Sequence, residues 1–136
     1  MKIYFAASIR GGRDDAHIYV ELIKLLQNYG TVLTEHVADA NLSNKGESQL
    51  NDQEIHNRDM NWLLESDIIV AEVTNPSLGV GYEIGRAIEN NKKVICLYNK
   101  KMNKNISAMI VGSPKIQSYS FNNIDSLKSI INKIFK

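Results

Sequence analysis

The sequence has little cysteine, no excess of charge of either sign and no long apolar run. Its single cysteine, Cys96, excludes a disulfide within the chain and is typical of a reducing compartment. Sixteen Lys and Arg residues stand against 15 Asp and Glu residues, and this balance argues against a nucleic-acid-binding surface. The apolar runs are too short for a membrane span or for a signal-peptide core. We therefore expect a cytoplasmic protein with no nucleic-acid or membrane partner.

Apolar runs of strand length alternate with segments of helical spacing along the 136 residues. Strands are predicted at 2–8, 31–37, 67–73, 93–99 and 116–121, and helices at about 13–29, 52–65, 80–90 and 124–135. Residues 38–51 read as a polar loop, and 106–112 as a short apolar piece of open type. Strict alternation predicts one α/β domain over 1–136, a doubly wound (Rossmann- or flavodoxin-like) five-stranded parallel sheet with helices on both faces.

In such folds ligands bind beyond the carboxyl ends of the strands, so the loops there are the first candidates for a site. The first strand ends in "SIRGGR", where Gly11 and Gly12 permit close backbone approach and a helix amino terminus follows. Ser8 adds a hydroxyl, and Arg10 and Arg13 add guanidinium groups. The loop is suited to a phosphate monoester, although a tight turn with solvated arginines would have the same composition. A single Gly-Gly pair does not make a dinucleotide fingerprint.

Asp59 is a carboxylate on a helix face that should be apolar, because it follows Ile55 by four residues and precedes Leu63 by four. Such a group costs free energy unless it is paired or used. Burial favours the protonated form of a carboxyl group, which is the form that a proton donor needs. The alternative is a salt bridge to a nearby Arg or Lys.

Glu83 comes after the third predicted strand, in "SDIIVAEVTNPSLGVGYEIGR", near the start of a predicted helix. A Glu in a first helical turn is common because the helix dipole favours it. Gly79 and Gly81, however, leave space around this turn, and Ser77 adds a polar atom. An ionised Glu beside an anomeric carbon can attack it and later be displaced by water. We interpret Glu83 as a candidate nucleophile.

The remaining candidates are weaker. Tyr4, inside the first strand, would need a partner for its hydroxyl, and a carboxylate in the cleft could provide one. His36, near the end of the second strand, could contact a heterocycle or be merely half-buried. No histidine has metal-ligand spacing to acidic or cysteine partners, so we expect no metal and no other cofactor.

Taken together, these residues resemble the nucleoside 2-deoxyribosyltransferase superfamily, and within it the hydrolases of 2'-deoxynucleoside 5'-phosphates. The resemblance rests on "IYFAASIRGGR", "YGTVLTEHVADA", "IHNRDMNWL", "DIIVAEVTNPSLGVGYEIGRA", "ICLY" and "SAMI" and covers most of the chain. The block ending in "PSLGVGYEIGRA" is long and specific, whereas the stretch after Gly112 carries little information. One departure is Ala7, where a glycine is expected; its methyl group could tighten the pocket.

The resemblance implies hydrolysis of the N-glycosidic bond of a deoxynucleoside monophosphate. It implies that Glu83 is the nucleophile, that Asp59 is the acid assisting departure of the base, and that Tyr4 positions the nucleophile. It also implies a homodimer, in which a serine reaches the phosphate of the partner subunit. The implied substrate-binding residues are Ser8, Ile9, Arg10, Gly11, Gly12, Arg13, His36, Ser77, Gly79, Ser107 and Met109.

Three other functions remain open at the level of the sequence. A nucleoside deoxyribosyltransferase would share the covalent intermediate but pass the sugar to another base, and it would not need the anion-binding "SIRGGR" loop. A hydrolase of ribonucleotides such as CMP is excluded poorly by the sequence. A non-catalytic nucleotide-binding module would leave Glu83 as an ordinary helix-start residue.

Overall fold

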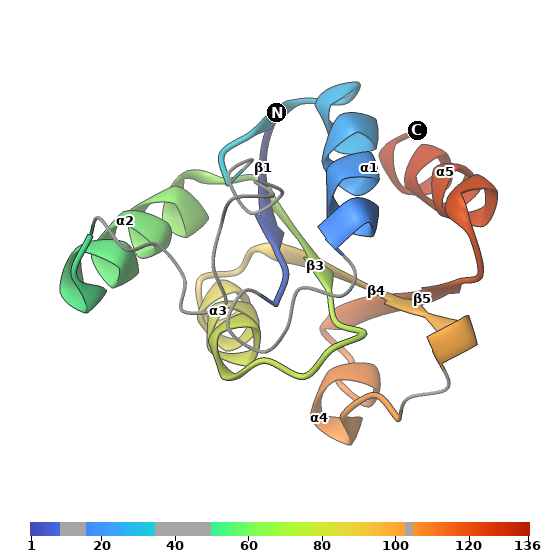
Figure 1. Cartoon of the computed structure of the whole chain (residues 1–136). Helices are drawn as coiled ribbons and strands as arrows, with labels where there is room; N and C mark the ends of the chain where they lie inside the picture. Colours follow the sequence, from blue (N-terminus) through green and yellow to red (C-terminus); the bar gives the residue numbers. More distant parts are fainter. Residues whose placement is uncertain (9–15, 35–49, 103–104) are drawn as a thin grey trace.

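The computed structural model describes residues 1–8, 16–34, 50–102 and 105–136, shown in Figure 1. No helix in these ranges is long and apolar enough to cross a membrane. The elements follow one another in the order β1 (Lys2–Ala6), α1 (Ala16–Gln27), β2 (Thr31–Val32), α2 (Asp52–Glu65), β3 (Ile68–Glu72), α3 (Leu78–Glu89), β4 (Lys93–Asn99), the 3₁₀ turn η2 (Lys100–Met102), α4 (Ala108–Val111), β5 (Ile116–Phe121) and α5 (Ile124–Phe135).

The five strands form one parallel sheet in the order β2-β1-β3-β4-β5, which confirms the predicted doubly wound α/β class. β3 is the central strand, and all five of its residues are buried because helices cover both faces of the sheet. β1 pairs with β3 so that Tyr4 lies opposite Ile69. This pairing brings residues from the first and third strands to the same part of the sheet.

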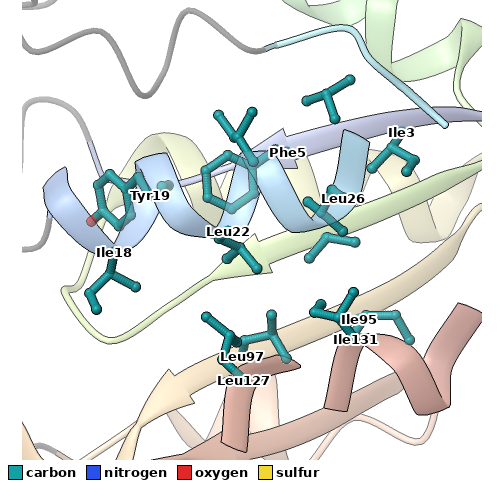
Figure 2. Packing of buried hydrophobic residues seen from close by; sticks show 14 of the residues in the cluster. Ile3, Phe5, Ile18, Tyr19, Leu22, Leu26, Ile95, Leu97, Leu127 and Ile131 are labelled. Atoms are coloured by element: carbon teal, nitrogen blue, oxygen red, sulfur yellow. The ribbon is translucent and has the colours of Figure 1, made fainter. Parts of the chain in front are cut away.

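Successive residues of β1 point to opposite faces of the sheet and enter two separate cores. Ile3 and Phe5 belong to the core that also contains Leu22 of α1 and Leu127 of α5. Figure 2 shows Phe5 beside Leu22 and Leu127 beside Leu97 of β4. Tyr4 and Ala6 belong to the other core, with residues of α2 and α3. Ala7 belongs to the α1 and α5 core, whereas Tyr4 belongs to the other core. The effect of its methyl group on the pocket stays a prediction.

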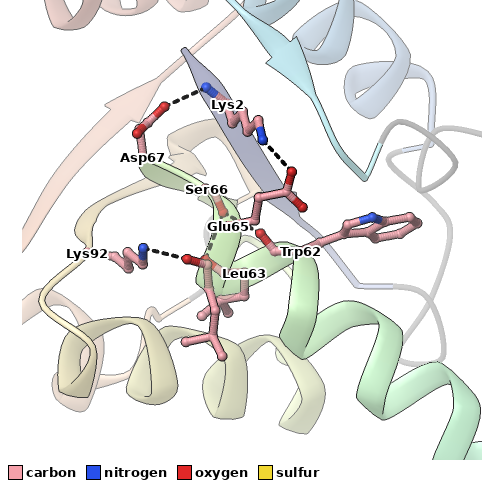
Figure 3. Close-up of polar contacts among 8 residues, drawn as sticks. Lys2, Trp62, Leu63, Glu65, Ser66, Asp67 and Lys92 are labelled. Carbon is pink, nitrogen blue, oxygen red and sulfur yellow. Dashed lines mark hydrogen bonds and ion pairs between the residues drawn. The ribbon is translucent and has the colours of Figure 1, made fainter.

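The carboxyl end of α2 is tied to the amino ends of β1 and β3 by polar contacts (Figure 3). The Lys2 backbone N–H donates to Asp67 Oδ2 at 2.7 Å, and Lys2 Nζ forms an ion pair with Glu65. Ser66 Oγ donates to the Trp62 and Leu63 carbonyls at 2.8 and 2.9 Å, closing the last turn of α2. These contacts hold one end of α2 against the sheet.

Several predicted boundaries agree with the structure, and the exceptions have local causes. The helices at 52–65 and 124–135 and the strands at 93–99 and 116–121 have the predicted limits. The strand predicted at 31–37 ends at Val32, because Thr34 Oγ1 accepts from the Phe5 N–H at 2.7 Å and donates to the Phe5 carbonyl at 2.6 Å, and residues 35–37 lie outside the described ranges. A side chain thereby takes the place of the next ladder hydrogen bonds. The segment 106–112 contains the short helix α4.

Candidate active site

Tyr4 and Glu83 meet on the α2 and α3 side of the sheet. The Tyr4 side chain is almost fully buried, and its hydroxyl donates a hydrogen bond to Glu83 Oε2. α3 begins at Leu78, two residues earlier than predicted, because the Ser77 hydroxyl accepts from the Val80 N–H and caps the helix. Glu83 therefore lies in the second turn rather than the first. A favourable helix dipole, which acts within the first turn, does not account for it.

Burial raises the pKa of Glu83 to about 7. The hydrogen bond from Tyr4 opposes this shift, whereas the negative charge of Asp59 adds to it. The pKa of Tyr4 is raised as well, first by burial and then by the charges of Glu83 and Asp59. Tyr4 consequently stays protonated at any ordinary pH and acts as a fixed donor to Glu83. Glu83 is a carboxylate balanced between its charged and neutral forms near neutrality.

The raised pKa of Glu83 predicts a pH-dependent stability. The folded protein holds the Glu83 proton up to about pH 7, whereas the unfolded chain releases it near the model value of 4.5. The folded state is thus favoured at low pH, and this contribution is lost as pH rises through about 7. We expect urea denaturation of Glu83→Gln to show a weaker fall in the free energy of unfolding between pH 5 and 8 than the parent protein. An identical pH dependence in both proteins would contradict the shift.

Asp59 lies on α2 and contributes to the electrostatic field of the Tyr4–Glu83 pair. Its side chain is about one quarter exposed, at the edge of the core formed by Met60 and Leu63. Arg58 donates two hydrogen bonds to Asp59 Oδ1, at 3.1 Å from Nε and 2.9 Å from Nη2. Asp59 is therefore both near the candidate nucleophile and paired with an arginine, as the alternative interpretation of the sequence required.

The loops at the carboxyl edge of the sheet supply further polar groups. Ser8 is fully buried after β1, and its hydroxyl makes no hydrogen bond within the described part of the chain. Ser77 lies after β3 and caps α3. A Cβ added to Gly79 would make only an ordinary 3.8 Å contact with Ser77 Oγ, so space alone does not require this glycine. The predicted contacts Ile9, Arg10, Gly11, Gly12, Arg13 and His36 lie outside the described residues.

Ser107 and Met109 line a cavity between α3 and α4 that Tyr4 does not line. Ser107 caps α4 by accepting from the Met109 N–H at 3.2 Å, and Met109 is 82% exposed. The cavity has a volume of about 830 Å³ and is lined mainly by apolar residues. Its lining includes Ser77, Ser107 and Met109 but none of Tyr4, Asp59 and Glu83. Within one chain, Ser107 and Met109 are not brought together with the three candidate catalytic residues.

Two polar residues with a part in the site were missed in the sequence. Arg58 is the partner of Asp59, and its position next to Asp59 was the available signal. Glu72 is buried at the end of β3, where its Oε1 accepts from the Thr74 N–H at 2.6 Å. Thr74 Oγ1 in turn accepts from the Asn99 N–H at 2.8 Å. Glu72 is the single acidic residue inside an apolar strand, and it shapes the loop that leads to Ser77.

Cys96 and possible metal ligands were the other candidates for a reactive site. Cys96 is fully buried in β4, and burial raises the pKa of its thiol to about 12, which leaves it unreactive. Within the described ranges, no three side chains of His, Cys, Asp or Glu are grouped as metal ligands would be.

The fold and the grouped carboxylates define a doubly wound α/β protein with an acidic site. The family model for nucleoside 2-deoxyribosyltransferase matches residues 3–127, and the chain belongs to that family. This confirms the resemblance inferred from the motifs.

Individual relatives agree with the family. The chain is 51% identical over 132 residues to 5-hydroxymethyl-dUMP N-hydrolase of Danio rerio, covering 93% of this chain and 92% of that protein. It is 57% identical over 114 residues to a Nematostella vectensis protein provisionally named 2'-deoxynucleoside 5'-phosphate N-hydrolase 1, covering 82% of this chain and 77% of that one. The solved structure of Clostridium botulinum CMP N-glycosidase has a TM-score of 0.70 at 16% identity, with 98% of this chain and 99% of that chain covered, and it supports the fold.

Proposed function

We propose that the protein hydrolyses the N-glycosidic bond of 2'-deoxynucleoside 5'-monophosphates, giving the free base and 2-deoxyribose 5-phosphate. Its relatives are named N-hydrolases, and the chain is an enzyme of the N-glycosidase class. The observation that carries the finer proposal is the hydrogen bond from Tyr4 to Glu83, with the charge of Asp59 close enough to raise the pKa of Glu83. A sugar carbon placed beside these three residues would face the Glu83 carboxylate, the Tyr4 hydroxyl as a fixed hydrogen-bond donor, and Asp59 as an acid.

In the first step, Glu83 attacks C1' of the deoxyribose. Tyr4 occupies Oε2, so we expect Oε1 to form the new bond to carbon. Each carboxyl group disfavours ionisation of the other, and the reactive form is the one in which Glu83 is ionised and Asp59 carries the proton. The electron pair of the C1'–N bond leaves with the base, and Asp59 supplies the proton that the base nitrogen takes up. Glu83 must be ionised to attack, and its pKa of about 7 therefore predicts that hydrolysis becomes faster as pH rises toward neutrality.

In the second step, water attacks C1' and displaces Glu83 as a carboxylate. Asp59, now without its proton, accepts one from the water, so the enzyme returns to its starting protonation. A deoxyribosyl centre suits this route, because no 2'-hydroxyl withdraws electron density from the developing positive charge. Binding energy from the 5'-phosphate can be used to hold the reacting carbon in place.

Ser8 and Ser77 support a phosphate site at the carboxyl edge of the sheet. Ser8 has a buried hydroxyl with no hydrogen bond in the described part of the chain, and Ser77 begins a helix whose amino terminus favours an anion. We propose that these groups, with the "SIRGGR" loop, contact the ester.

We further propose a homodimer in which Ser107 of each subunit completes the partner's site. The α3 and α4 cavity is apolar, and beside it Leu78 is 96% exposed and Met109 82% exposed. Large apolar side chains at that exposure are typical of an interaction surface. The surface includes Ser77, at the start of the helix that carries Glu83, so a partner bound here would lie near the phosphate side.

Ser107→Ala should weaken the preference for phosphorylated substrates. Loss of one hydrogen bond to a charged group costs about 1.5–3 kcal/mol, which predicts a fall of roughly 10- to 100-fold in kcat/KM for the nucleotide and little change for the nucleoside. Steady-state kinetics on both substrates would measure this, with sedimentation to check that the variant remains dimeric. Ser129→Ala, on the outer part of α5, is the matched control. An equal loss on nucleoside and nucleotide would contradict the phosphate role.

The experiment that tests the proposed function is a substrate panel followed by detection of released base. It would include deoxynucleotides with ordinary bases and 5-hydroxymethyluracil, the matching ribonucleotides, and deoxynucleosides without phosphate. We expect release from deoxynucleotides only. Base exchange without a need for phosphate would identify a transferase, preference for ribonucleotides would identify a CMP-type hydrolase, and binding without release would identify a non-catalytic module.

A further inference from the structure

Arg58 donates hydrogen bonds to Asp59, its neighbour in sequence, although adjacent residues of a helix do not normally face one another. Neighbouring residues on a helix point about 100° apart and do not face one another. The Arg58 guanidinium nevertheless reaches Asp59 with both Nε and Nη2, at 3.1 and 2.9 Å. The long side chain must therefore fold across the helix surface to meet the carboxylate. Both bonds end on the same atom, Oδ1.

Trp62 provides the surface that holds Arg58 in this conformation. It lies one turn further along α2, and the Arg58 guanidinium carbon sits over its ring, 4.8 Å from the centroid. Arg58 and Asp59 are each only about one quarter exposed, so neither the stacking nor the ion pair is fully in water. A planar guanidinium can stack on an aromatic ring and donate two hydrogen bonds at once, which an ammonium cannot do.

The charge of Arg58 also reaches the rest of the site. It lowers the pKa of Tyr4, in opposition to burial and to the two carboxylates. The groups that face Asp59 include Arg58 from α2 itself, Glu83 from α3 and Tyr4 from β1, and Arg58 is the cation among these three.

We propose that Arg58, supported by Trp62, is a positioning residue that fixes the orientation and charge of Asp59 for its part in glycosidic-bond cleavage. Both guanidinium bonds to Oδ1 fix the direction in which the Asp59 carboxyl group points. Because the pair places a positive charge beside the Asp59 carboxyl group, we expect removal of that charge to change the pH dependence of the reaction. This inference rests on the proposed function, in which Asp59 is the proton donor.

Kinetics of Arg58→Lys and Arg58→Gln test the proposal. Lysine keeps the charge but cannot form the two-point contact, and glutamine removes the charge. We expect kcat to fall between about tenfold and 100-fold in each, with KM little changed, because a misplaced proton donor slows chemistry rather than binding. In Arg58→Gln, the alkaline limb of the pH profile should also move to higher pH, whereas in Arg58→Lys it should move less.

The control is the same pair of substitutions at Arg86. Arg86 also places its guanidinium over an aromatic ring, 5.8 Å from the centroid of Tyr82, and donates to the Tyr82 hydroxyl at 3.0 Å. These contacts do not involve Asp59, so we expect the Arg86 variants to leave the alkaline limb in place. The melting temperature of each variant, compared with that of the parent, shows whether a loss of activity comes from unfolding or from a misplaced Asp59.

A double-mutant comparison shows whether Arg58 acts through Asp59. In an Asp59→Asn background, Arg58→Lys should have little further effect on kcat, since the group that it positions is gone. An equal loss in both backgrounds, or an alkaline limb that stays in place in Arg58→Gln, would overturn the proposal.

A titration of the ¹³C-labelled Asp59 side chain by NMR tests the ion pair without any substrate. Arg58→Gln should move the titration of the Asp59 carboxyl carbon to higher pH, and Arg86→Gln should not. If the parent enzyme hydrolyses no nucleotide while this titration moves as expected, the proposed function fails and the pairing stands. If hydrolysis is found and the titration does not move, the inference about Arg58 fails alone.

Discussion

Replacing Glu83 by alanine abolishes hydrolysis of deoxynucleoside monophosphates, by at least about 10⁴-fold in kcat, because removal of a covalent nucleophile leaves only binding and electrostatic effects. Glu83→Gln should have a similar effect, since an amide retains the shape and the hydrogen bond to Tyr4 but is a poor nucleophile. Released base, measured over long incubations, gives the rate. Mass spectrometry of enzyme quenched during turnover should show a deoxyribosyl-phosphate adduct on the parent and none on either variant.

Glu21→Gln is the matched control for Glu83. Glu21 is an exposed carboxylate on α1 whose Oε1 lies 3.8 Å from Lys24 Nζ, and such surface pairs contribute little. Its turnover should equal that of the parent. Binding of the product 2-deoxyribose 5-phosphate to Glu83→Ala should remain largely intact. If Glu83→Gln hydrolyses as fast as the parent, the covalent route is wrong, whatever the substrate.

Asp59→Asn lowers the rate by about 10²- to 10⁴-fold for substrates whose base leaves poorly, because the departing nitrogen then lacks a proton donor. The loss should shrink for bases that are stable as anions and need no proton to leave. A series of deoxynucleotides with bases of decreasing basicity measures this directly, with kcat of variant and parent compared for each base. The structure supports the test, since Asn keeps the shape of Asp at a position only about one quarter exposed.

The dependence on leaving group separates acid catalysis from damage to the site. A variant that had lost the placement of Glu83 would be slow with every base by the same factor. Equal losses across the series would therefore contradict the acid role of Asp59. Asp125→Asn in the first turn of α5, at an exposed position far along the chain from the site, is expected to behave as the parent.

Local features of the fold could be predicted from the sequence because their causes are local. The period of Ile124, Leu127 and Ile131 determines the buried face of α5, and Asn123 caps that helix. The errors arose where a side chain outside the pattern intervened. Thr34 ends β2 early by bonding to the backbone of Phe5, and Ser77 starts α3 early by capping it.

The candidate site could be predicted only in part. Asp59 was recognisable because it is a carboxylate on a helix face that should be apolar. Glu83 was singled out by its position after the third strand and Tyr4 by its need for a hydroxyl partner. Arg58 was not recognised, since side chains of adjacent helical residues ordinarily diverge and its contact depends on the ring of Trp62. Ser107 and Met109 line a cavity of the single chain that does not include the three candidate catalytic residues, which the one-dimensional pattern did not indicate.

The alternation of strands and helices, and with it the parallel sheet, could be predicted from the pattern of apolar residues. The unusual polar residues within these elements were also visible there. The tertiary structure was needed to show that Tyr4 and Glu83, 79 residues apart, share a hydrogen bond. It was also needed to show that the charge of Asp59 raises the pKa of both groups. The reason is that strand pairing and helix packing join distant segments. Periodicity reports which face of an element is buried, whereas the pairing of β1 with β3 determines which buried faces meet.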